Sequence, residues 1–169
     1  MLDNIWLIPL LPFISSVVLI LTAGKLPRGA VAAFGAGSIG ASALVVFGVA
    51  YEFMQHPEPF GLSLWTWMRI GDFAPGFAFY IDQLSVVMMC IITGVGFLIH
   101  LYSTEFMQDD SDYSRYFAYM NMFVAAMLIL VMADNLLLLY LGWEGVGVCS
   151  YLLVGFWYKD PANGAASRK

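Results

Sequence analysis

Residues 136–156 read LLLLYLGWEGVGVCSYLLVGF, and this run decides the fold class. At about 1.5 Å of rise per residue, a helix of this length crosses the hydrocarbon core of a bilayer. Glu144 is the only charged residue in the run and its ninth residue. It therefore lies roughly 12 Å from one end, near the middle of the membrane. The run predicts a membrane-spanning helix with a carboxyl group at mid-depth.

The composition of the whole chain is that of a membrane protein. Of its 169 residues, 61% are hydrophobic and 11% are charged, whereas about 25% are charged in an average soluble domain. Five apolar runs are long enough to span a bilayer, namely 5–23, 30–53, 84–102, 116–133 and 136–158. We therefore predict an all-α integral membrane protein with five transmembrane helices.

Residues 55–82 are too polar, and too often interrupted by Gly and Pro, to cross the membrane. Two stretches rich in aromatic residues, 62–70 and 77–81, flank a turn-forming segment at 71–76. This pattern predicts a β-hairpin between helices 2 and 3 that lies at the membrane interface. Its expected interfacial aromatics are Trp65, Trp67, Phe77, Phe79 and Tyr80. Asp82 is expected to cap the third helix, with Ser85 three residues on.

The distribution of Lys and Arg predicts the orientation. If the runs alternate across the bilayer, Arg69 lies alone on one side, and six basic residues lie on the other: Lys25, Arg28, Arg115, Lys159, Arg168 and Lys169. The positive-inside rule then places the N-terminus and the hairpin outside. The expected division is helices 1 and 2 in 1–54, an external loop in 55–82, helices 3 to 5 in 83–158 and a cytoplasmic tail in 159–169. The tail has no terminating element, so we expect a fragment of a longer protein.

Glu144 is the main candidate functional residue. A carboxylate at mid-membrane depth costs about 3 kcal/mol or more to insert, and such groups usually face a protein interior or a water-filled path. Desolvation favours the protonated form of a buried carboxyl, which indicates proton transfer. Tyr140 and Tyr151 share a helical face with Glu144 and could extend a hydrogen-bonded chain. The alternative is a neutral Glu144 that only fixes helix packing. The nearby Gly142, Gly145 and Gly147 are expected to let backbones or water approach the carboxyl.

Other polar residues are weaker candidates. His100 lies near the inner end of its run, where it could relay protons or contact water and lipid headgroups. Asp134 is expected to be a helix cap, and the small residues of 30–53 are expected to serve helix packing. His56 and His100 lie in different segments without suitably spaced ligands, so no metal site is predicted. Cys90 and Cys149 fall inside apolar runs and are expected to be inert thiols.

Several stretches together resemble the chain 5 (subunit L) family of proton-pumping NADH:quinone oxidoreductase. They are LWTW at 64–67, DQLS at 82–85, TGVGFLIH at 93–100, SRYFAY at 114–119, ADNLL at 133–137, LGWEGVG at 141–147 and CSYLL at 149–153. The resemblance covers the whole chain and corresponds to the N-terminal part of the family. It implies that 83–158 begin a proton-translocating repeat, in which Glu144 works with a lysine that lies in a later helix. It also implies that this chain binds no cofactor, because NADH, FMN, iron–sulfur clusters and quinone are bound by other subunits.

The resemblance implies a membrane subunit that moves protons while electrons pass from NADH to quinone elsewhere in the complex. Expected partners are the other membrane subunits and the lipid bilayer, in a bacterial inner membrane, and no basic patch suggests nucleic acid. One alternative is a subunit of a multisubunit cation/proton antiporter. Members of that group tend to carry Leu-Thr-Ser after the glutamate, where this chain has Gly145-Val146-Gly147. A membrane-bound hydrogenase subunit and a non-transporting structural protein are the remaining alternatives.

Overall fold

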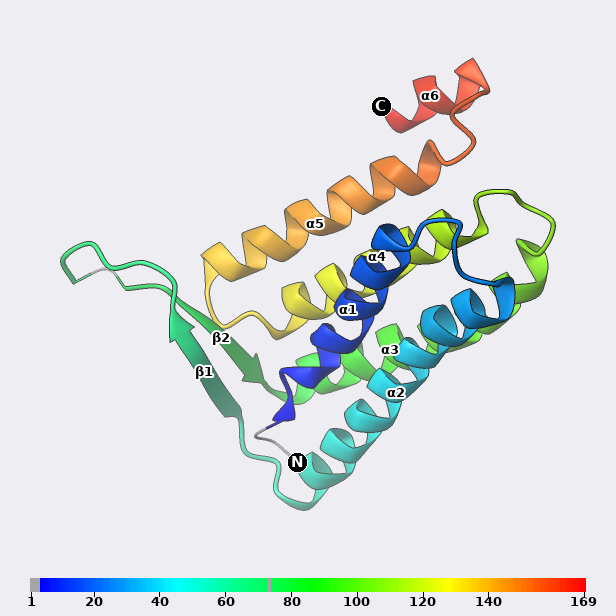
Figure 1. Ribbon diagram of the computed structural model, residues 1–169. Coiled ribbons are helices and arrows are strands. Elements are labelled where there is room, and N and C mark those ends of the chain that lie inside the picture. The colour runs from blue at the N-terminus through cyan, green and yellow to red at the C-terminus, as the bar shows by residue number, and fades with distance from the viewer. Residues whose placement is uncertain (1–3, 73) are drawn as a thin grey trace.

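Figure 1 shows the computed structural model, which describes residues 4–72 and 74–169. Two parts of the predicted regions lie outside the described residues: residues 1–3 of the region 1–54, and residue 73 of the predicted hairpin turn. The elements in chain order are α1 (Leu7–Leu21), α2 (Arg28–Gln55), β1 (Phe60–Thr66), β2 (Gly76–Ile81), α3 (Gln83–Phe106), α4 (Tyr113–Met132), α5 (Leu136–Val154) and α6 (Pro161–Ser167). The helical architecture and the position of the β-hairpin between α2 and α3 are as predicted.

Four helices, α2 to α5, are long and apolar enough to cross a membrane, whereas α1 is shorter. The first predicted run covers 5–23, but the helix has 15 residues, which is about 22 Å of rise. The chain turns directly after α1, where Thr22 O accepts from Lys25 N at 2.8 Å. Gly24 in this turn has a φ of 73°, a conformation that glycine adopts without steric cost. The turn therefore ends α1 before the apolar run itself ends.

The centre of the bundle is α4, which packs against α1, α2, α3, α5 and β2. Serine hydroxyls on α1 join it to two neighbours, because Ser15 donates to Phe34 O at 2.8 Å and Ser16 donates to Ala118 O at 2.7 Å. Within α1, Pro12 has no N–H to donate to Ile8 O one turn earlier. That carbonyl instead accepts from the Ser42 hydroxyl of α2 at 2.7 Å. The proline is thus tolerated because a neighbouring helix satisfies the freed backbone group.

The first strand of the hairpin begins and ends a few residues earlier than the sequence predicts. The strand β1 covers Phe60–Thr66 rather than 62–70, and it pairs antiparallel with β2 from Phe60↔Ile81 to Thr66↔Gly76. A register shift between Ser63 and Trp65 interrupts the ladder. The pairing ends at Gly76 because the next residue toward the turn is Pro75, which lacks an N–H donor. Beyond it, a single hydrogen bond of 2.9 Å from Trp67 N to Pro75 O continues the contact.

One of the predicted interfacial aromatics belongs to the core. Phe79 is buried, with 2% of its surface exposed, in a cluster with Ile8, Phe53 and Leu138. Its neighbour Phe77 is half-buried, and stacks on the exposed Trp65 with ring centroids 4.6 Å apart. The prediction of an interfacial role is therefore wrong for Phe79, because β2 presents alternate residues to the helices and this side chain faces inward.

The turn between α4 and α5 is docked on the hairpin. Asp134 N donates to Ala78 O at 3.1 Å, and the Asn135 side chain donates to Gly76 O at 2.9 Å. Asn135 also caps α5, since its side-chain oxygen accepts from Leu138 N at 3.0 Å. The expectation that Asp134 is the cap is wrong, because the chain enters α5 one residue later.

The predicted cap of α3 is confirmed. The Asp82 carboxylate accepts from Ser85 N at 2.8 Å, and the Ser85 hydroxyl accepts from Asp82 N at 2.7 Å. These two residues form a reciprocal capping box. The hydrogen bonds from the Ser85 backbone and side chain hold the pKa of Asp82 below its ordinary value. Asp82 therefore stabilises the start of α3 as an ionised group.

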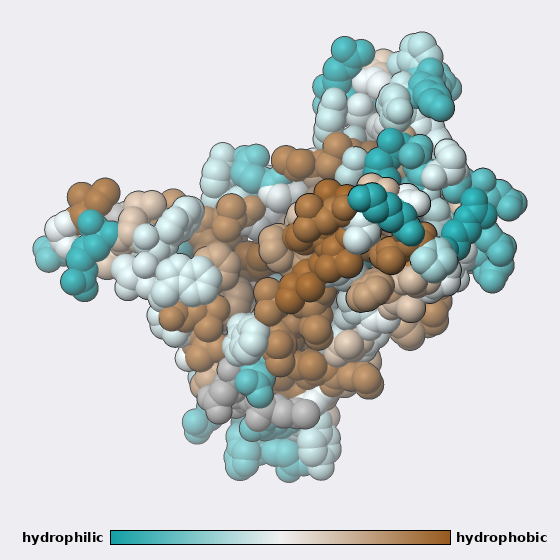
Figure 2. Space-filling view, in the orientation of Figure 1, coloured by the Kyte–Doolittle hydropathy of each residue, from teal (hydrophilic) through white to brown (hydrophobic). Residues whose placement is uncertain are grey.

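The two ends of the bundle differ in charge. The turns after α1, α3 and α5 lie together at the end opposite the hairpin, as Figure 1 shows. This end carries Lys25, Arg28, Arg115, Lys159, Arg168 and Lys169, and Arg69 lies beyond β1 in the hairpin. In Figure 2, hydrophilic residues gather at both ends of the visible face, and hydrophobic residues form the surface between them. This arrangement fits a protein that spans a bilayer.

Candidate functional site

Glu144 lies on the outer face of α5, away from the rest of the bundle. It is the ninth of the 19 residues of this helix, and its side chain is exposed. Tyr140 and Tyr151 are also exposed, at 60% and 51%, as are Leu141 and Val148. The structure therefore confirms that the predicted face exists, and it brings Glu144, Tyr140 and Tyr151 together on one side of one helix.

The opposite face of α5 packs on α4 through glycine. A Cβ atom on Gly142 would lie 2.7 Å from the backbone nitrogen of Leu130, and one on Gly145 would lie 2.9 Å from the Cβ of Ala126. These two glycines let the helices approach closely, as glycines in membrane helices commonly do. The approach expected near the carboxyl occurs instead on the α4 side of the helix, away from Glu144. A Cβ on Gly147 would meet nothing within 4 Å.

The groups around Glu144 come from its own helix. The carboxylate interacts with the Tyr140 phenol, one helical turn earlier. Among residues 4–72 and 74–169, no hydrogen bond or ion pair joins Glu144 to another helix. A carboxylate at this depth has a large cost of insertion unless protein or water covers it. Among the described residues, no other helix covers the outer face of α5 at Glu144.

His100 is separated from Glu144. It is fully buried within the bundle, with its ring centroid 6.1 Å from that of Phe117 on α4. Its Nδ1 lies 2.7 Å from Gly96 O, and its Nε2 is buried without a hydrogen-bond partner in the described structure. Because α4 packs against both α3 and α5, His100 and Glu144 lie on different sides of it. The alternative that His100 contacts water or headgroups is wrong, since its side chain is inaccessible.

The sequence interpretation missed Asn121, a fully buried polar residue of α4. Its side-chain nitrogen donates to Phe117 O at 3.0 Å, and its side-chain oxygen accepts from the Ser38 hydroxyl of α2 at 3.0 Å. An amide in the middle of an apolar run is itself a signal of an interhelical hydrogen bond. Both of its polar atoms are satisfied inside the bundle, so Asn121 has a structural role.

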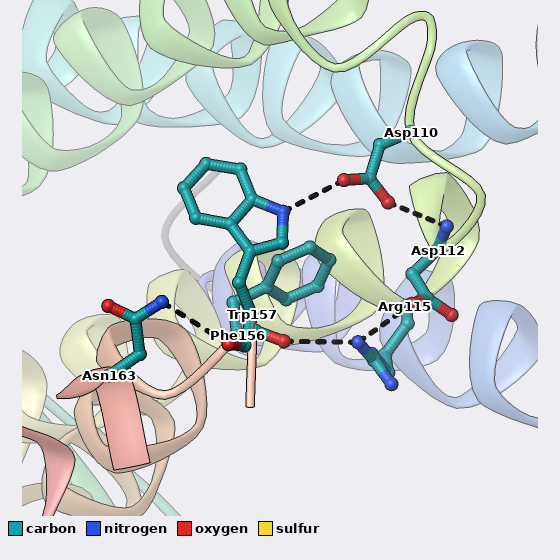
Figure 3. Close-up of polar contacts among 6 residues, drawn as sticks. All are labelled: Asp110, Asp112, Arg115, Phe156, Trp157 and Asn163. Atoms are coloured by element: carbon teal, nitrogen blue, oxygen red, sulfur yellow. Dashed lines mark hydrogen bonds and ion pairs between the residues drawn. The ribbon is translucent and has the colours of Figure 1, made fainter. Parts of the chain in front are cut away.

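A second polar network lies at the basic end of the molecule (Figure 3). Arg115 donates through Nη2 to Asp112 Oδ2 at 3.0 Å and to Phe156 O at 3.2 Å. Trp157 donates to Asp110 Oδ2 at 2.9 Å. This hydrogen bond, together with one from Asp112 N and the charges of Arg115 and Arg28, holds the pKa of Asp110 below its ordinary value. The network joins the turn before α4 to the end of α5.

No metal or disulfide chemistry is evident in the described part of the chain. Cys90 and Cys149 are free thiols. No group of three or more His, Cys, Asp or Glu side chains among the described residues is arranged to hold a metal ion. The candidate chemistry is therefore that of Glu144 and the two tyrosines on its face.

Comparison with known proteins identifies the family. Residues 67–117 match the family described as "NADH-Ubiquinone oxidoreductase (complex I), chain 5 N-terminus". Residues 133–169 match the family described as "NADH:quinone oxidoreductase/Mrp antiporter, TM". NADH-quinone oxidoreductase subunit L of Escherichia coli (strain K12) is 50% identical over 161 residues, or 95% of this chain. The chain belongs to the chain 5 (subunit L) family of complex I.

Other relatives agree with this assignment. Subunit L of Pseudomonas aeruginosa is 47% identical over 163 residues. The chloroplastic NAD(P)H-quinone oxidoreductase subunit 5 of Anthoceros angustus is 34% identical over 170 residues. The chain spans about a quarter of the length of the bacterial relatives, 26% in both cases. It thus corresponds to the N-terminal part of subunit L, an antiporter-like membrane subunit of complex I.

The fold is also found in a solved antiporter assembly. A chain of the Mrp complex from Dietzia sp. DQ12-45-1b superposes with a TM-score of 0.71 at 26% identity. The match covers 89% of this chain and 16% of the Mrp chain. The overall fold described above is therefore similar to that of part of the Mrp chain.

Proposed function

We propose that Glu144 binds and releases a proton as part of the proton-translocating path of a complex I membrane subunit. The observation that carries the proposal is the position of Glu144, at the middle of a membrane-length helix and on its uncovered face. A charge-bearing residue at this depth is costly, and such residues usually serve transport.

The packing alternative fits the geometry less well. A glutamate that fixed helix packing would donate or accept hydrogen bonds across an interface, as Asn121 does with Ser38. The α4–α5 interface is instead formed by Gly142 and Gly145 on the opposite side of the helix. Glu144 therefore takes no part in the α4–α5 contact, and its exposed carboxyl is accessible for proton exchange.

The two tyrosines would extend the path along α5. Tyr140 lies within electrostatic reach of Glu144, one helical turn earlier, and Tyr151 lies on the same exposed face toward the basic end. A phenol can both donate and accept a hydrogen bond, so it can take part in proton transfer without a change in its own net charge. His100 would act in a separate place inside the bundle, where its uncommitted Nε2 is a potential proton acceptor.

We further propose that the shorter helix α1 spans the membrane together with the four long helices α2 to α5. This helix packs along α2 and α4, and the turn residues and local bilayer thinning would make up for its short length. In this proposal the end with six basic residues, including residue 169, lies in the cytoplasm of a bacterial cell and the hairpin lies outside, which the positive-inside rule supports.

In this proposal the complex transfers electrons from NADH to quinone through cofactors held by other subunits, and this subunit moves protons in response. A Mrp-type cation/proton antiporter is the second candidate, because the fold matches that complex. The identity of 50% to subunit L, against 26% to the Mrp chain, favours the oxidoreductase. Glu144 would have the same proton-binding role in either assembly.

The test compares three substitutions in the assembled complex. Glu144→Gln keeps the shape and hydrogen-bonding capacity of the side chain but cannot titrate, so proton pumping should fall strongly while assembly persists. Glu144→Asp keeps the acid with a shorter side chain, and should retain partial pumping. Glu105→Gln, at the exposed end of α3, is the matched control and should pump normally. An assembled Glu144→Gln complex with the wild-type ratio of protons per NADH would refute the proposal.

A further inference from the structure

A cavity at the basic end of the molecule has the chemistry of an anion site. Its volume is about 360 Å³, and it lies between the start of α4, the end of α5 and α6. Its polar lining consists of two arginines and four hydroxyl groups, from Arg115, Arg168, Tyr119, Tyr151, Tyr158 and Ser167. No carboxylate is among its lining residues.

A neighbouring cavity shows the contrast. It has a volume of about 530 Å³ and also borders Arg115, but Asp110 and Asp112 line it together with Arg28. Its charges therefore cancel. The first cavity has two arginines and no acid in its lining. Asp112 pairs with Arg115 at 3.0 Å from the other side, which leaves the charge of Arg168 unbalanced. The first cavity is therefore the more positive of the two and attracts anions more strongly than its neighbour.

Arg115 is held rigidly beside this cavity. Its two hydrogen bonds, to Asp112 and to Phe156 O, both come from Nη2, as Figure 3 shows. Its guanidinium carbon lies 4.8 Å from the ring centroid of Phe156 and 5.2 Å from that of Tyr158. Nε is buried without an acceptor, and Nη1 makes no hydrogen bond within the described residues. The guanidinium is thus fixed in place, and Nη1 is its terminal nitrogen without a hydrogen bond among the described residues.

Arg168 supplies the second cation in a different way. Its Nε donates to Gly164 O at 3.0 Å, which leaves both terminal nitrogens available. The Ser167 hydroxyl donates to the same carbonyl at 3.1 Å, so α6 turns both side chains toward the cavity that they line. Two guanidinium groups with unused donors suit the several oxygens of a phosphate group.

The cavity lies at the level where a bilayer surface is expected. It is bounded by the last residues of α5, and its apolar lining includes Leu152 and Phe156. Tyrosines at this depth are typical of the membrane–water interface, and basic pockets between membrane helices bind anionic lipid headgroups. We propose that this cavity binds the phosphate headgroup of an anionic phospholipid from the adjacent leaflet.

The test is photocrosslinking of the purified, delipidated complex with a phosphatidylglycerol that carries a diazirine near its headgroup. The wild-type protein should be labelled within residues 115–119 or 151–168. Unlabelled phosphatidylglycerol should compete, whereas phosphatidylcholine and inorganic phosphate should not. Effective competition by inorganic phosphate would show that the site binds free phosphate. Competition by phosphatidylcholine as strong as that by phosphatidylglycerol would show that the site binds lipids without headgroup selectivity. Either result would overturn the proposal.

Variants of the exposed Arg168 distinguish specific binding in the cavity from general electrostatic attraction to a basic surface. Arg168→Gln should lower labelling about tenfold or more, the effect of losing hydrogen bonds to a charged group. Lys159→Gln removes one charge from the same end but is not part of the cavity lining, and should lower labelling less than about fivefold. Arg168→Lys keeps the charge and loses the planar fork, so labelling should still fall. Unchanged labelling in Arg168→Lys would show diffuse attraction and contradict the proposal.

Discussion

The adjacent helices α4 and α5 have similar lengths and apolar composition, but they use their polar residues in opposite ways. Nine residues of α4 are buried, compared with three of α5. The polar residue in the middle of α4, Asn121, is fully satisfied by Phe117 O and Ser38. The acid in the middle of α5, Glu144, lies on an exposed face without a partner from another described helix. The comparison indicates that α4 holds the described bundle together, whereas α5 leaves its central acid on an uncovered face.

The largest effect on stability is expected where the two helices touch. Gly142→Ala would place a Cβ 2.7 Å from the Leu130 backbone, which cannot move like a side chain. We expect the free energy of unfolding to fall by about 1–3 kcal/mol, measured as a lower thermal midpoint in detergent. Gly147→Ala is the matched control, because its Cβ would meet nothing within 4 Å. Equal loss from both variants would show that α5 does not pack as described.

A smaller effect is expected from Asn121→Leu, which keeps the side-chain volume but removes the hydrogen bond to Ser38. Interhelical hydrogen bonds in membranes contribute about 0.6 kcal/mol on average, so the thermal midpoint should fall modestly. Ser38→Ala should cost less, because it leaves the bond between Asn121 and Phe117 O intact. A Leu variant as stable as the wild type would show that Asn121 does not serve the structural role assigned to it.

The network at the end of α5 should make a pH-dependent contribution. The hydrogen bond from Trp157 is the main cause that lowers the pKa of Asp110. A lowered pKa in the folded state means that the stabilisation is complete above the unfolded value of about 3.9 and is lost as the pH falls. Trp157→Phe should therefore reduce stability slightly at neutral pH, and this difference should shrink below about pH 4. A difference that grew on acidification would contradict the assignment.

The smallest effect on stability is expected at Glu144 itself. Because the side chain has no partner on another described helix, Glu144→Gln should leave the free energy of unfolding within about 0.5 kcal/mol of wild type. Chemical denaturation in detergent provides the same comparison. A large loss would restore the packing alternative, in which the carboxyl fixes the position of α5.

The sequence was sufficient to predict the helices and the position of Glu144 because hydrophobic runs and single charges are local features. The cap formed by Asp82 and Ser85 is also predictable from the sequence, since it depends on two residues that are three positions apart. The hydrogen bond from Asn135 to Gly76 is not predictable from the sequence, because it joins residues that are 59 positions apart. The same holds for the roles of Gly142 and Gly145, which depend on the face that α5 turns toward α4. Burial of His100 likewise follows from tertiary packing, including the contact with Phe117 of α4, which no local pattern contains.

The most direct test of the central claim is to follow the protonation of Glu144 during turnover. Infrared difference spectra of the assembled complex, recorded before and after addition of NADH, report carboxyl groups that gain or lose a proton. We predict a carboxylic-acid C=O difference signal in the wild-type complex that is absent in Glu144→Gln and present in the control Glu105→Gln. Identical carboxyl signals in the wild type and Glu144→Gln would show that this residue keeps one protonation state, and would contradict its role in proton transfer.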